Sequence, residues 1–307
     1  MAGVGAGLGV DRLGFVGFGE AAFHLAKGLR EAGVKRTVAF DIHMHTPGRG
    51  EKIQERAQET GTGLVEFPAA LPAAADVIIS AVTADQAVDA AKQTAPYLTS
   101  RHIYADLNSV SPRTKQMVAE TITHSGAKFV EIAVMGPIPP HLHKTPMLIG
   151  GTSAPEFQEL FAPYGTRMDV VSTGQIGRAA AVKMFRSVIY KGLEALIFEC
   201  VLGASHYGAE DRVFASLAEN FPGIDWKKLA DYMVGRVVVH GERRAREMDE
   251  VARTLEELGI EPMMAAAAAR RMDWAANLDL RGKFNGEFPK TYQEVLDVLS
   301  KPSLVQK

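Results

Sequence analysis

The chain has little of what marks several large classes of protein. Its 307 residues include one cysteine, Cys200, so an internal disulfide and a cysteine-rich zinc site are excluded, as suits a reducing cytoplasm. The formal net charge is only −2, which gives no basic surface for nucleic acid or for an anionic membrane. No run approaches the roughly 20 apolar residues that a membrane helix needs. These absences predict a cytoplasmic protein that binds neither nucleic acid nor membrane.

The first ten residues are rich in glycine but carry none of the context that gives glycine a role. No strand precedes these glycines and no helical pattern follows them. The segment also lacks the basic flank and the long apolar region of a signal peptide. We therefore predict a flexible leader over residues 1–10.

Residues 12–41 carry the pattern of a dinucleotide-binding βαβ unit. A short apolar run at 13–16 predicts a buried strand, and Gly17, Gly19 and Ala22 follow at the spacing of the dinucleotide fingerprint. Helical periodicity then runs over 21–31. A second apolar run at 37–40 ends in Asp41, which lies 24 residues beyond Gly17. Strand, glycines, helix, strand and acid thus occur in the order that binds a dinucleotide.

Each position in this unit has a physical reason. Gly17 permits the tight turn from strand to helix, and Gly19 lets the backbone approach a pyrophosphate. The phosphates would lie against the positive end of the helix, where its backbone N–H groups are free. Asp41 would accept hydrogen bonds from a ribose 2′-hydroxyl and repel a 2′-phosphate, so NAD is favoured and NADP is the alternative. The predicted cofactor-binding residues of this unit are Gly17, Phe18, Gly19, Glu20, Ala21 and Asp41.

Apolar runs and helical patterns continue to alternate up to about residue 173. The further predicted strands are 64–67, 76–82, 102–105, 129–134, 147–149 and 169–171. The helices between them are 51–59, 84–95, 111–124 and 154–162. This alternation is typical of a doubly wound, Rossmann-type α/β sheet, which we assign to residues 11–173.

Strand patterns end after Gly174, and the remainder predicts an all-α domain over 174–307. Its first helix spans about 175–207 and is apolar nearly all round, which predicts burial on most sides. Cys200 lies in this helix and is interpreted as a core residue. The later predicted helices are 210–219, 225–240, 241–258, 262–276 and 288–299. This domain would bind the substrate and form a dimer.

The segments that leave the carboxyl ends of the strands are the candidates for binding and chemistry. Val82 and Thr83 are predicted to pack beside the cofactor. Asn108 and Ser109 could face the nicotinamide or the substrate, whereas Ser111, before Pro112, is better explained as a helix cap. The segment of three residues that follows the 129–134 strand is a candidate substrate loop, formed by Met135, Gly136 and Pro137.

Lys183 is the predicted catalytic charge. It lies in the long apolar helix, where desolvation would lower its pKa toward the range useful for exchanging a proton with a carbonyl or hydroxyl oxygen. Ser187 follows one helical turn later on the same face and could bind the same substrate. The alternative is that Lys183 extends along the helix to reach solvent.

Two other groups of side chains have more than one interpretation. His141 and His143 could form a metal site with His43 or His45, but no ligand spacing supports one, so loop histidines are favoured and no metal is predicted. A second group shares one helix face and could bind a substrate anion across a dimer, or could equally form a solvated, salt-bridged surface. Its members are Arg236, His240 and Arg243 or Arg244.

Four segments taken together resemble the β-hydroxyacid dehydrogenases, the group of 3-hydroxyisobutyrate and 6-phosphogluconate dehydrogenases. These segments are GFVGFGEAA, SAVTAD, DLNSVSP and GQIGRAAAVKMFRS. The resemblance covers the N-terminal domain and the long helix, and the helical remainder looks like a divergent branch. It implies that Lys183 is the general acid/base and that the protein is a homodimer whose cleft receives residues of the partner's helical domain.

The sequence departs from that family at positions that concern the substrate. The family's Ser-Gly-Gly loop is replaced by Met135-Gly136-Pro137, and Ser187 stands where the family has asparagine. Ala22 replaces the third fingerprint glycine, a tolerated change. Hydride chemistry is compatible with these differences, but the groups that would bind a substrate carboxylate are altered.

The sequence therefore predicts an NAD(P)-dependent oxidoreductase that acts on a small hydroxyacid or alcohol, or on its carbonyl, with Lys183 as acid/base. An imine reductase on the same fold is the first alternative, and the retained lysine argues against it. A dinucleotide sensor without turnover is the second alternative. A buried lysine argues against it, because a sensor needs no acid/base. Asp41 predicts tighter binding of NADH than of NADPH unless Arg49 or another loop cation overrides it.

Overall fold

The computed structural model describes residues 9–300, and the chain divides into two compact units, Met1–Lys183 and Met184–Lys307. Residues 1–8 of the predicted leader lie outside the described residues. At its end, Val10 is buried, and its backbone N–H donates to the Tyr164 hydroxyl at 2.9 Å.

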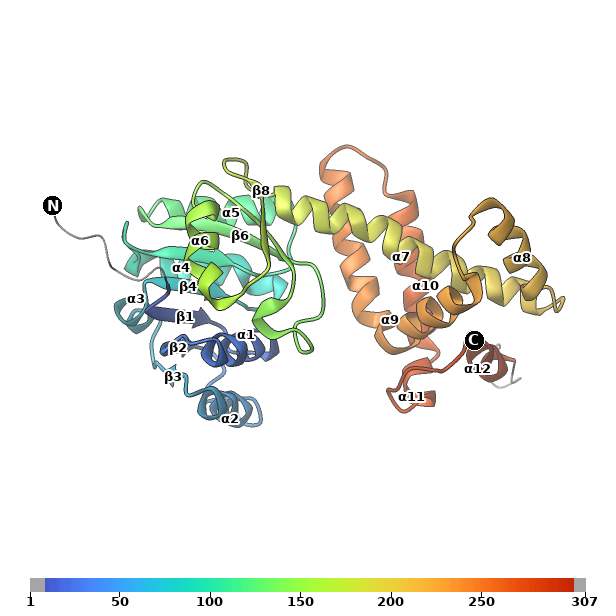
Figure 1. The fold of residues 1–307 in the computed structure, drawn as a ribbon, viewed down its shortest axis with the longest axis horizontal. Coiled ribbons are helices and arrows are strands. Elements are labelled where there is room, and N and C mark those ends of the chain that lie inside the picture. Colours follow the sequence, from blue (N-terminus) through green and yellow to red (C-terminus); the bar gives the residue numbers. More distant parts are fainter. Residues whose placement is uncertain (1–8, 301–307) are drawn as a thin grey trace. The chain divides into compact units, whose positions relative to one another are not determined.

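The first unit is built on one eight-stranded sheet in the order β3-β2-β1-β4-β5-β6-β7-β8 (Figure 1). All neighbouring strands are parallel except β6 and β7, which are antiparallel. The strands are β1 Arg12–Val16, β2 Arg36–Phe40, β3 Gly63–Leu64, β4 Val77–Ser80, β5 Ile103–Asp106, β6 Lys128–Val134, β7 Met147–Gly150 and β8 Met168–Ser172. The predicted doubly wound α/β fold is confirmed.

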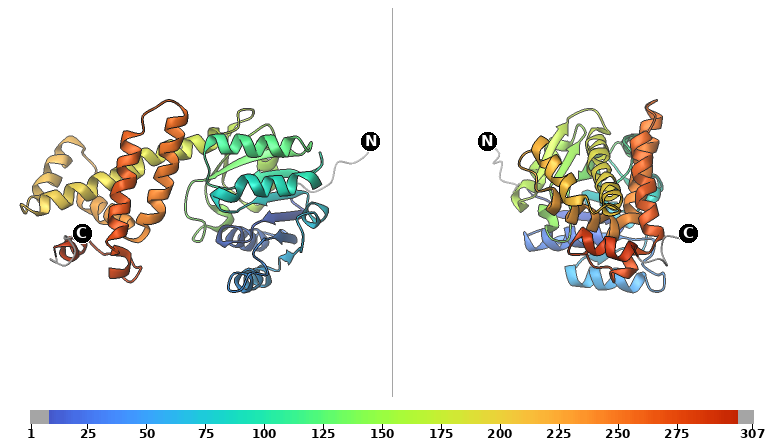
Figure 2. Two further views of the ribbon diagram at one scale, coloured as in Figure 1. Left: turned by 180° about the vertical axis from the view of Figure 1, so that it is seen from behind. Right: turned by 90° about the vertical axis from the view of Figure 1, so that its right-hand side faces the viewer.

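Helices cover both faces of this sheet (Figures 1 and 2). One face packs against α1 (Glu20–Glu31), α2 (Gly50–Thr60) and α6 (Ala154–Phe161). The other packs against α3 (Ala70–Ala74), α4 (Ala87–Thr94) and α5 (Pro112–Thr123). Alternate residues of one strand enter the two cores: Val77 and Ile79 of β4 face the first, and Ile78 faces the second. Burial on both faces explains why the central strands are mainly apolar.

The second unit consists of helices, as predicted. The helices are α7 Arg178–Ser205, which begins in the first unit, α8 Glu210–Asn220, α9 Trp226–Glu257, α10 Met263–Asn277, α11 Leu280–Lys283 and α12 Tyr292–Leu299. Its core forms where α7, α9 and α10 contribute apolar side chains such as Phe198, Val237 and Met272. Among residues 9–300, no helix combines the length and the apolar character needed to cross a bilayer.

The prediction of two helices over 225–240 and 241–258 is wrong, because α9 is one helix of 32 residues. Gly241 lies in its middle rather than at a helix end. A Cβ built on Gly241 would lie 3.1 Å from the Met272 carbonyl oxygen of α10. The glycine therefore allows α9 and α10 to approach closely, and it does not interrupt the helix.

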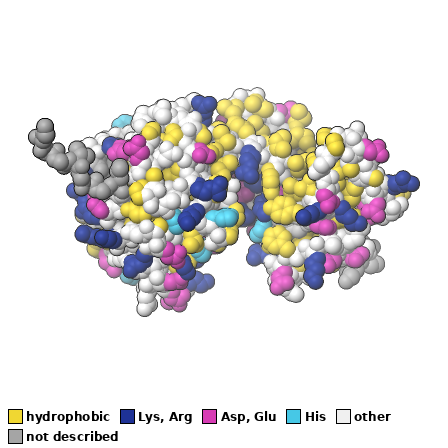
Figure 3. Space-filling view, viewed as in Figure 1, with side chains coloured by type: hydrophobic (Ala, Val, Ile, Leu, Met, Phe, Trp, Pro, Cys, Tyr) yellow, Lys and Arg dark blue, Asp and Glu magenta, His cyan; other side chains and the backbone are white. Residues whose placement is uncertain are grey.

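The prediction that the long helix is buried on most sides is also wrong for the single chain. Val182, Ile189 and Leu196 follow one another at intervals of seven residues along α7, and they are 44%, 68% and 53% exposed. Figure 3 shows further apolar side chains on the surface of the helical unit. The helix thus has an apolar stripe that the rest of the described chain leaves uncovered.

Candidate functional site

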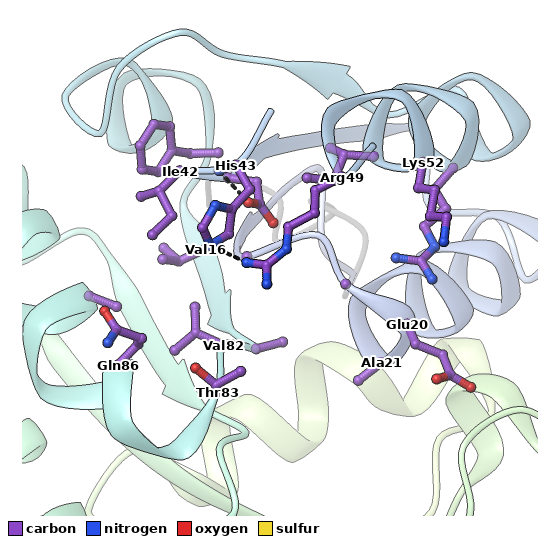
Figure 4. A pocket seen from close by; sticks show the side chains of 18 of the residues that line it. Val16, Glu20, Ala21, Ile42, His43, Arg49, Lys52, Val82, Thr83 and Gln86 are labelled. Carbon is purple, nitrogen blue, oxygen red and sulfur yellow. Dashed lines mark hydrogen bonds between the residues drawn. The ribbon is translucent and has the colours of Figure 1, made fainter. Parts of the chain in front are cut away.

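A cavity of about 820 Å³ opens at the carboxyl ends of β1, β2 and β4 (Figure 4). Its walls come from the loop before α1, the turn between β2 and α2, the first turns of α2, and the segment after β4. Parallel sheets bind dinucleotides at this edge. The predicted cofactor-binding residues that line it are Gly17, Gly19, Glu20, Ala21, Asp41, Val82 and Thr83.

The loop between β1 and α1 has the geometry that the fingerprint predicts. Gly17 has φ +82°, and a Cβ there would lie 2.6 Å from the Ala81 carbonyl oxygen, so only glycine fits. Gly19 is the N-cap of α1 and places no side chain on the helix end. A Cβ on Gly19 would meet no atom within 4 Å. The uncapped helix end and the open space before it fit a pyrophosphate.

Asp41 holds the two loops at this edge together. Its Oδ2 accepts a hydrogen bond from the Phe18 backbone N–H at 2.7 Å, and its Oδ1 accepts one from the His43 N–H at 2.9 Å. The Phe18 side chain points into the core, where it is fully buried beside Phe15. Phe18 can therefore serve a cofactor only through its backbone.

Asn108 is buried and hydrogen-bonded to the protein. Its Oδ1 accepts from the Val82 N–H at 2.7 Å, and its Nδ2 donates to the Ser80 hydroxyl at 3.0 Å and to the Asp106 carboxylate. Both of its amide hydrogens are thus engaged. Asn108 holds the Val82 backbone at the cavity wall.

Lys115 completes this network and was missed from the sequence. It is 1% exposed, and its Nζ donates to Asp106 Oδ2 at 2.7 Å and to the Asp106 and Ile132 carbonyl oxygens. Lys115 is spaced at three, four and seven residues from Val118, Ala119 and Ile122, so it lies on the apolar face of α5. This spacing could have indicated a buried lysine. The predicted cap is confirmed at the start of this helix, where the Ser111 hydroxyl accepts from the Thr114 N–H at 3.1 Å.

Lys183 and Ser109 lie together in the first unit. The Lys183 Nζ donates to the Ser109 hydroxyl at 2.7 Å, and the lysine is half-buried. Ser109 follows the carboxyl end of β5, so this pair lies at the edge of the sheet that binds cofactors. Ser187 follows Lys183 by four residues along α7.

The start of α7 is fixed by a second residue that the sequence did not reveal. Glu131 of β6 is fully buried, and its carboxylate accepts from the backbone N–H groups of Gly177, Ala179 and Ala180 at 2.9, 3.2 and 3.4 Å. A carboxylate is favourable at the positive end of a helix. Glu131 thereby holds the turn that precedes Lys183 against the sheet.

The predicted substrate loop does not line the cavity described above. Met135 donates its backbone N–H to the Pro146 carbonyl, and the Thr145 hydroxyl lies 3.4 Å from the Pro137 carbonyl. Gly136 lies between them. Further along, the buried His143 contacts the Tyr164 carbonyl through Nε2 at 2.8 Å. Among residues 9–300, no group of three or more His, Cys, Asp or Glu side chains is arranged to hold a metal ion.

The residues of the predicted basic stripe, all in the helical unit, differ in burial: some lie in its interior and others on its surface. Arg244 is 3% exposed and makes a two-pronged ion pair with the fully buried Glu194, whereas Arg243 lies on the surface and pairs with Glu247. Arg236 approaches Glu194 at 3.3 Å. Burial, together with a group of arginines, lowers the pKa of His240 to about 4, so this ring is neutral near pH 7. The arginines are Arg243, Arg236, Arg244 and Arg281.

The two glycines of the fingerprint give a direct test of the pyrophosphate site. We expect Gly19→Ala to leave the free energy of unfolding within about 0.5 kcal/mol of wild type, and to weaken dinucleotide binding roughly tenfold or more. The added methyl group fits the free protein but fills the space a phosphate needs. Urea unfolding and calorimetric titration with NADPH measure the two effects. Gly17→Ala is the contrast, because its Cβ clashes with Ala81 and should lower stability. Unchanged affinity in Gly19→Ala would contradict the assignment.

Comparison with known proteins finds the same two parts in the chain. The model of the NAD binding domain of 6-phosphogluconate dehydrogenase matches residues 12–174, and a domain of unknown function, DUF1932, matches residues 204–275. The structure of a conserved hypothetical protein from Sinorhizobium meliloti is 36% identical, with 94% of this chain and 96% of that chain covered and a TM-score of 0.81.

Two further relatives point to dehydrogenases. A conserved protein of unknown function, whose structure is described as similar to 3-hydroxyacid dehydrogenases, is 32% identical over 90% of this chain and 99% of its own, with a TM-score of 0.74. The mitochondrial 3-hydroxyisobutyrate dehydrogenase of Drosophila melanogaster is 24% identical over 71% of this chain and 66% of its own. The resemblance inferred from the motifs is thereby confirmed.

Proposed function

The chain belongs to the family defined by the NAD binding domain of 6-phosphogluconate dehydrogenase, and on that premise we propose that it is an NAD(P)-dependent oxidoreductase. It transfers a hydride between the nicotinamide and a small hydroxyacid or alcohol, or the corresponding carbonyl compound. The cavity at the carboxyl edge of the sheet holds the dinucleotide, with the pyrophosphate between Gly17 and the start of α1. The dinucleotide, when bound, supplies or accepts the hydride.

The observation that carries the proposal is the contact between Lys183 and Ser109. An ammonium group at 2.7 Å from a serine hydroxyl can donate a proton to an oxygen that lies within hydrogen-bond reach of both. In the reductive direction, Lys183 protonates the carbonyl oxygen as the hydride arrives. In the oxidative direction, its neutral amine removes the hydroxyl proton. Ser109 orients the same oxygen.

The remaining groups of the proposed site bind the substrate. Ser187, one turn beyond Lys183, offers a hydroxyl. The loop formed by Met135, Gly136 and Pro137 offers backbone groups. In the homodimer, His240 of the helical unit offers a neutral ring, in a strongly cationic setting, to a substrate bound across the dimer. The protein acts as a homodimer, a proposal supported by the exposed apolar stripe of Val182, Ile189 and Leu196.

A turnover panel tests this function. Hydroxyacids, simple alcohols, keto acids and cyclic imines are offered with each nicotinamide cofactor, and the change in nicotinamide absorbance is followed. We expect turnover of a hydroxyacid or alcohol, or of its carbonyl. Faster reduction of cyclic imines than of ketones under matched conditions would assign an imine reductase instead. Tight dinucleotide binding with no turnover of any class would favour a sensor.

A further inference from the structure

The N-cap and the first two turns of helix α2 carry three cations that all line the cavity. Arg49, Lys52 and Arg56 stand at intervals of three and four residues, the spacing that places side chains on one side of a helix. Figure 4 shows Arg49 extending from the start of this helix into the cavity, with Lys52 projecting from the same helix. The cavity therefore has a basic wall on its α2 side.

The acids of α2 lie elsewhere. Glu51, Glu55 and Glu59 are exposed, and none of them lines the cavity. Glu59 is paired with Lys27 of α1 at 2.7 Å. Within residues 9–300, none of the three cavity cations forms an ion pair. The helix thus separates its charges, and the uncompensated positive ones are directed to the cavity.

Arg49 is also held in place. Its Nη1 lies 3.1 Å from the His43 ring Nε2, and Figure 4 shows the guanidinium beside that ring. The His43 backbone N–H in turn donates to Asp41 at 2.9 Å. A guanidinium that is already oriented loses less side-chain entropy when it binds an oxyanion, and its planar donors suit two phosphate oxygens.

Asp41 is the residue that would oppose a phosphate, but its charge is partly compensated. Both of its carboxylate oxygens accept backbone N–H hydrogen bonds, from Phe18 and His43. The other acids that line the cavity, Glu20 and Asp85, lie at the start of α1 and in the segment after β4. The α2 side of the cavity therefore carries three cations, whereas Asp41 already accepts two backbone hydrogen bonds.

We propose that the α2 face formed by Arg49, Lys52 and Arg56 binds the 2′-phosphate of the adenosine ribose. The protein then binds NADP(H) more tightly than NAD(H), in contrast to the preference expected from Asp41 alone. Asp41 serves mainly to join the β1–α1 loop to the β2–α2 turn. This inference rests on the proposed function only in requiring that the cavity binds a nicotinamide dinucleotide.

Equilibrium binding tests the proposal without any substrate. The affinities of the full chain for NADPH and NADH are measured by isothermal titration calorimetry, together with those for adenosine 2′,5′-bisphosphate and adenosine 5′-monophosphate. We expect NADPH to bind roughly tenfold more tightly than NADH, since each charge-assisted hydrogen bond contributes about one power of ten in affinity. The bisphosphate should show the same advantage over the monophosphate, and both advantages should shrink as salt rises.

Substitutions locate the site. Arg49→Gln and Lys52→Gln should each weaken NADPH binding roughly tenfold and leave NADH binding unchanged. Lys35→Gln is the matched control, because Lys35 is an exposed cation just before β2, at the amino end of the same strand, and does not line the cavity. It should alter neither affinity.

The outcomes separate this inference from the proposed function. Equal affinities, or tighter binding of NADH, would overturn the 2′-phosphate site and leave the dehydrogenase proposal intact. Equal losses for both cofactors in Arg49→Gln and Lys52→Gln would also overturn it, since the cations would then serve a part that both cofactors share. Binding of neither cofactor would instead overturn the proposed function.

Discussion

Replacement of Lys183 by alanine is expected to lower kcat by about 10²- to 10⁴-fold, the usual contribution of a positioned general acid or base. The Lys183 Nζ donates to the Ser109 hydroxyl at 2.7 Å. The dinucleotide cavity is lined by other residues. Its affinity for NADPH should therefore stay within about twofold of wild type. Single-turnover hydride transfer and calorimetric titration measure the two quantities on the same preparations.

Two further variants make the result specific. Lys128→Ala removes a partly exposed lysine at the amino end of β6, where it pairs with Glu156, and should leave kcat unchanged. Lys183→Arg keeps the positive charge but does not exchange its proton near neutral pH. We expect Lys183→Arg to be as slow as Lys183→Ala. Recovery of turnover in Lys183→Arg would contradict acid/base chemistry and leave Lys183 an electrostatic role.

The βαβ unit and the sheet could be predicted because their signals are local. The turn at Gly17, the helix that starts at Glu20 and the cap at Ser111 each depend on residues within a few positions of one another. The strands of a parallel sheet are mainly apolar because both faces are covered, so each strand is visible as a short run. The alternation of strands and helices then predicts the doubly wound fold class.

The wrong helix boundary between residues 240 and 241 has the opposite origin. Gly241 lies at that boundary, and glycine has low intrinsic helix propensity. The structure places the Met272 carbonyl 3.1 Å from where a Cβ would lie, so close packing against α10 decides the outcome. That contact joins residues 31 positions apart and leaves no trace in the sequence around Gly241.

In the candidate site too, the residues with a local sequence signal could be predicted and those that depend on distant partners could not. Gly17, Asp41 and Lys183 could be found because a motif or an apolar setting marks each of them. Glu131 and Lys115 could not be assigned, because their roles come from partners far along the chain: the Ala179 N–H for Glu131, and the Asp106 carboxylate, together with the Ile132 carbonyl, for Lys115. A charged residue on an apolar strand or helix face is ambiguous until its partner is known.

Arg243 and Arg244 show how strongly two neighbouring arginines can differ in burial. Both belong to the basic stripe seen in the sequence, yet Arg243 pairs with Glu247 at the surface and Arg244 is buried against Glu194. An exposed pair contributes little to stability, whereas removal of one member of a buried pair leaves an uncompensated charge in the core. The two substitutions should therefore differ strongly.

We expect Arg244→Leu to lower the free energy of unfolding of the helical unit by about 3–5 kcal/mol. Arg236 lies 3.3 Å from the same carboxylate and should keep the loss near the lower end of that range. Arg243→Leu, the matched control, should cost under about 1 kcal/mol. Urea unfolding followed by tryptophan fluorescence reports on this unit specifically, because both tryptophans of the chain, Trp226 and Trp274, belong to it.

A double variant separates charge from packing. In Glu194→Leu with Arg244→Leu, no charge of the pair is left buried, so part of the stability lost in Arg244→Leu should return. If the loss came from the missing arginine side chain alone, the double variant would be no more stable than the single one. Equal stability of Arg244→Leu and Arg243→Leu would show that the buried pair does not hold the helical unit together. The apolar contacts among α7, α9 and α10 would then account for its stability.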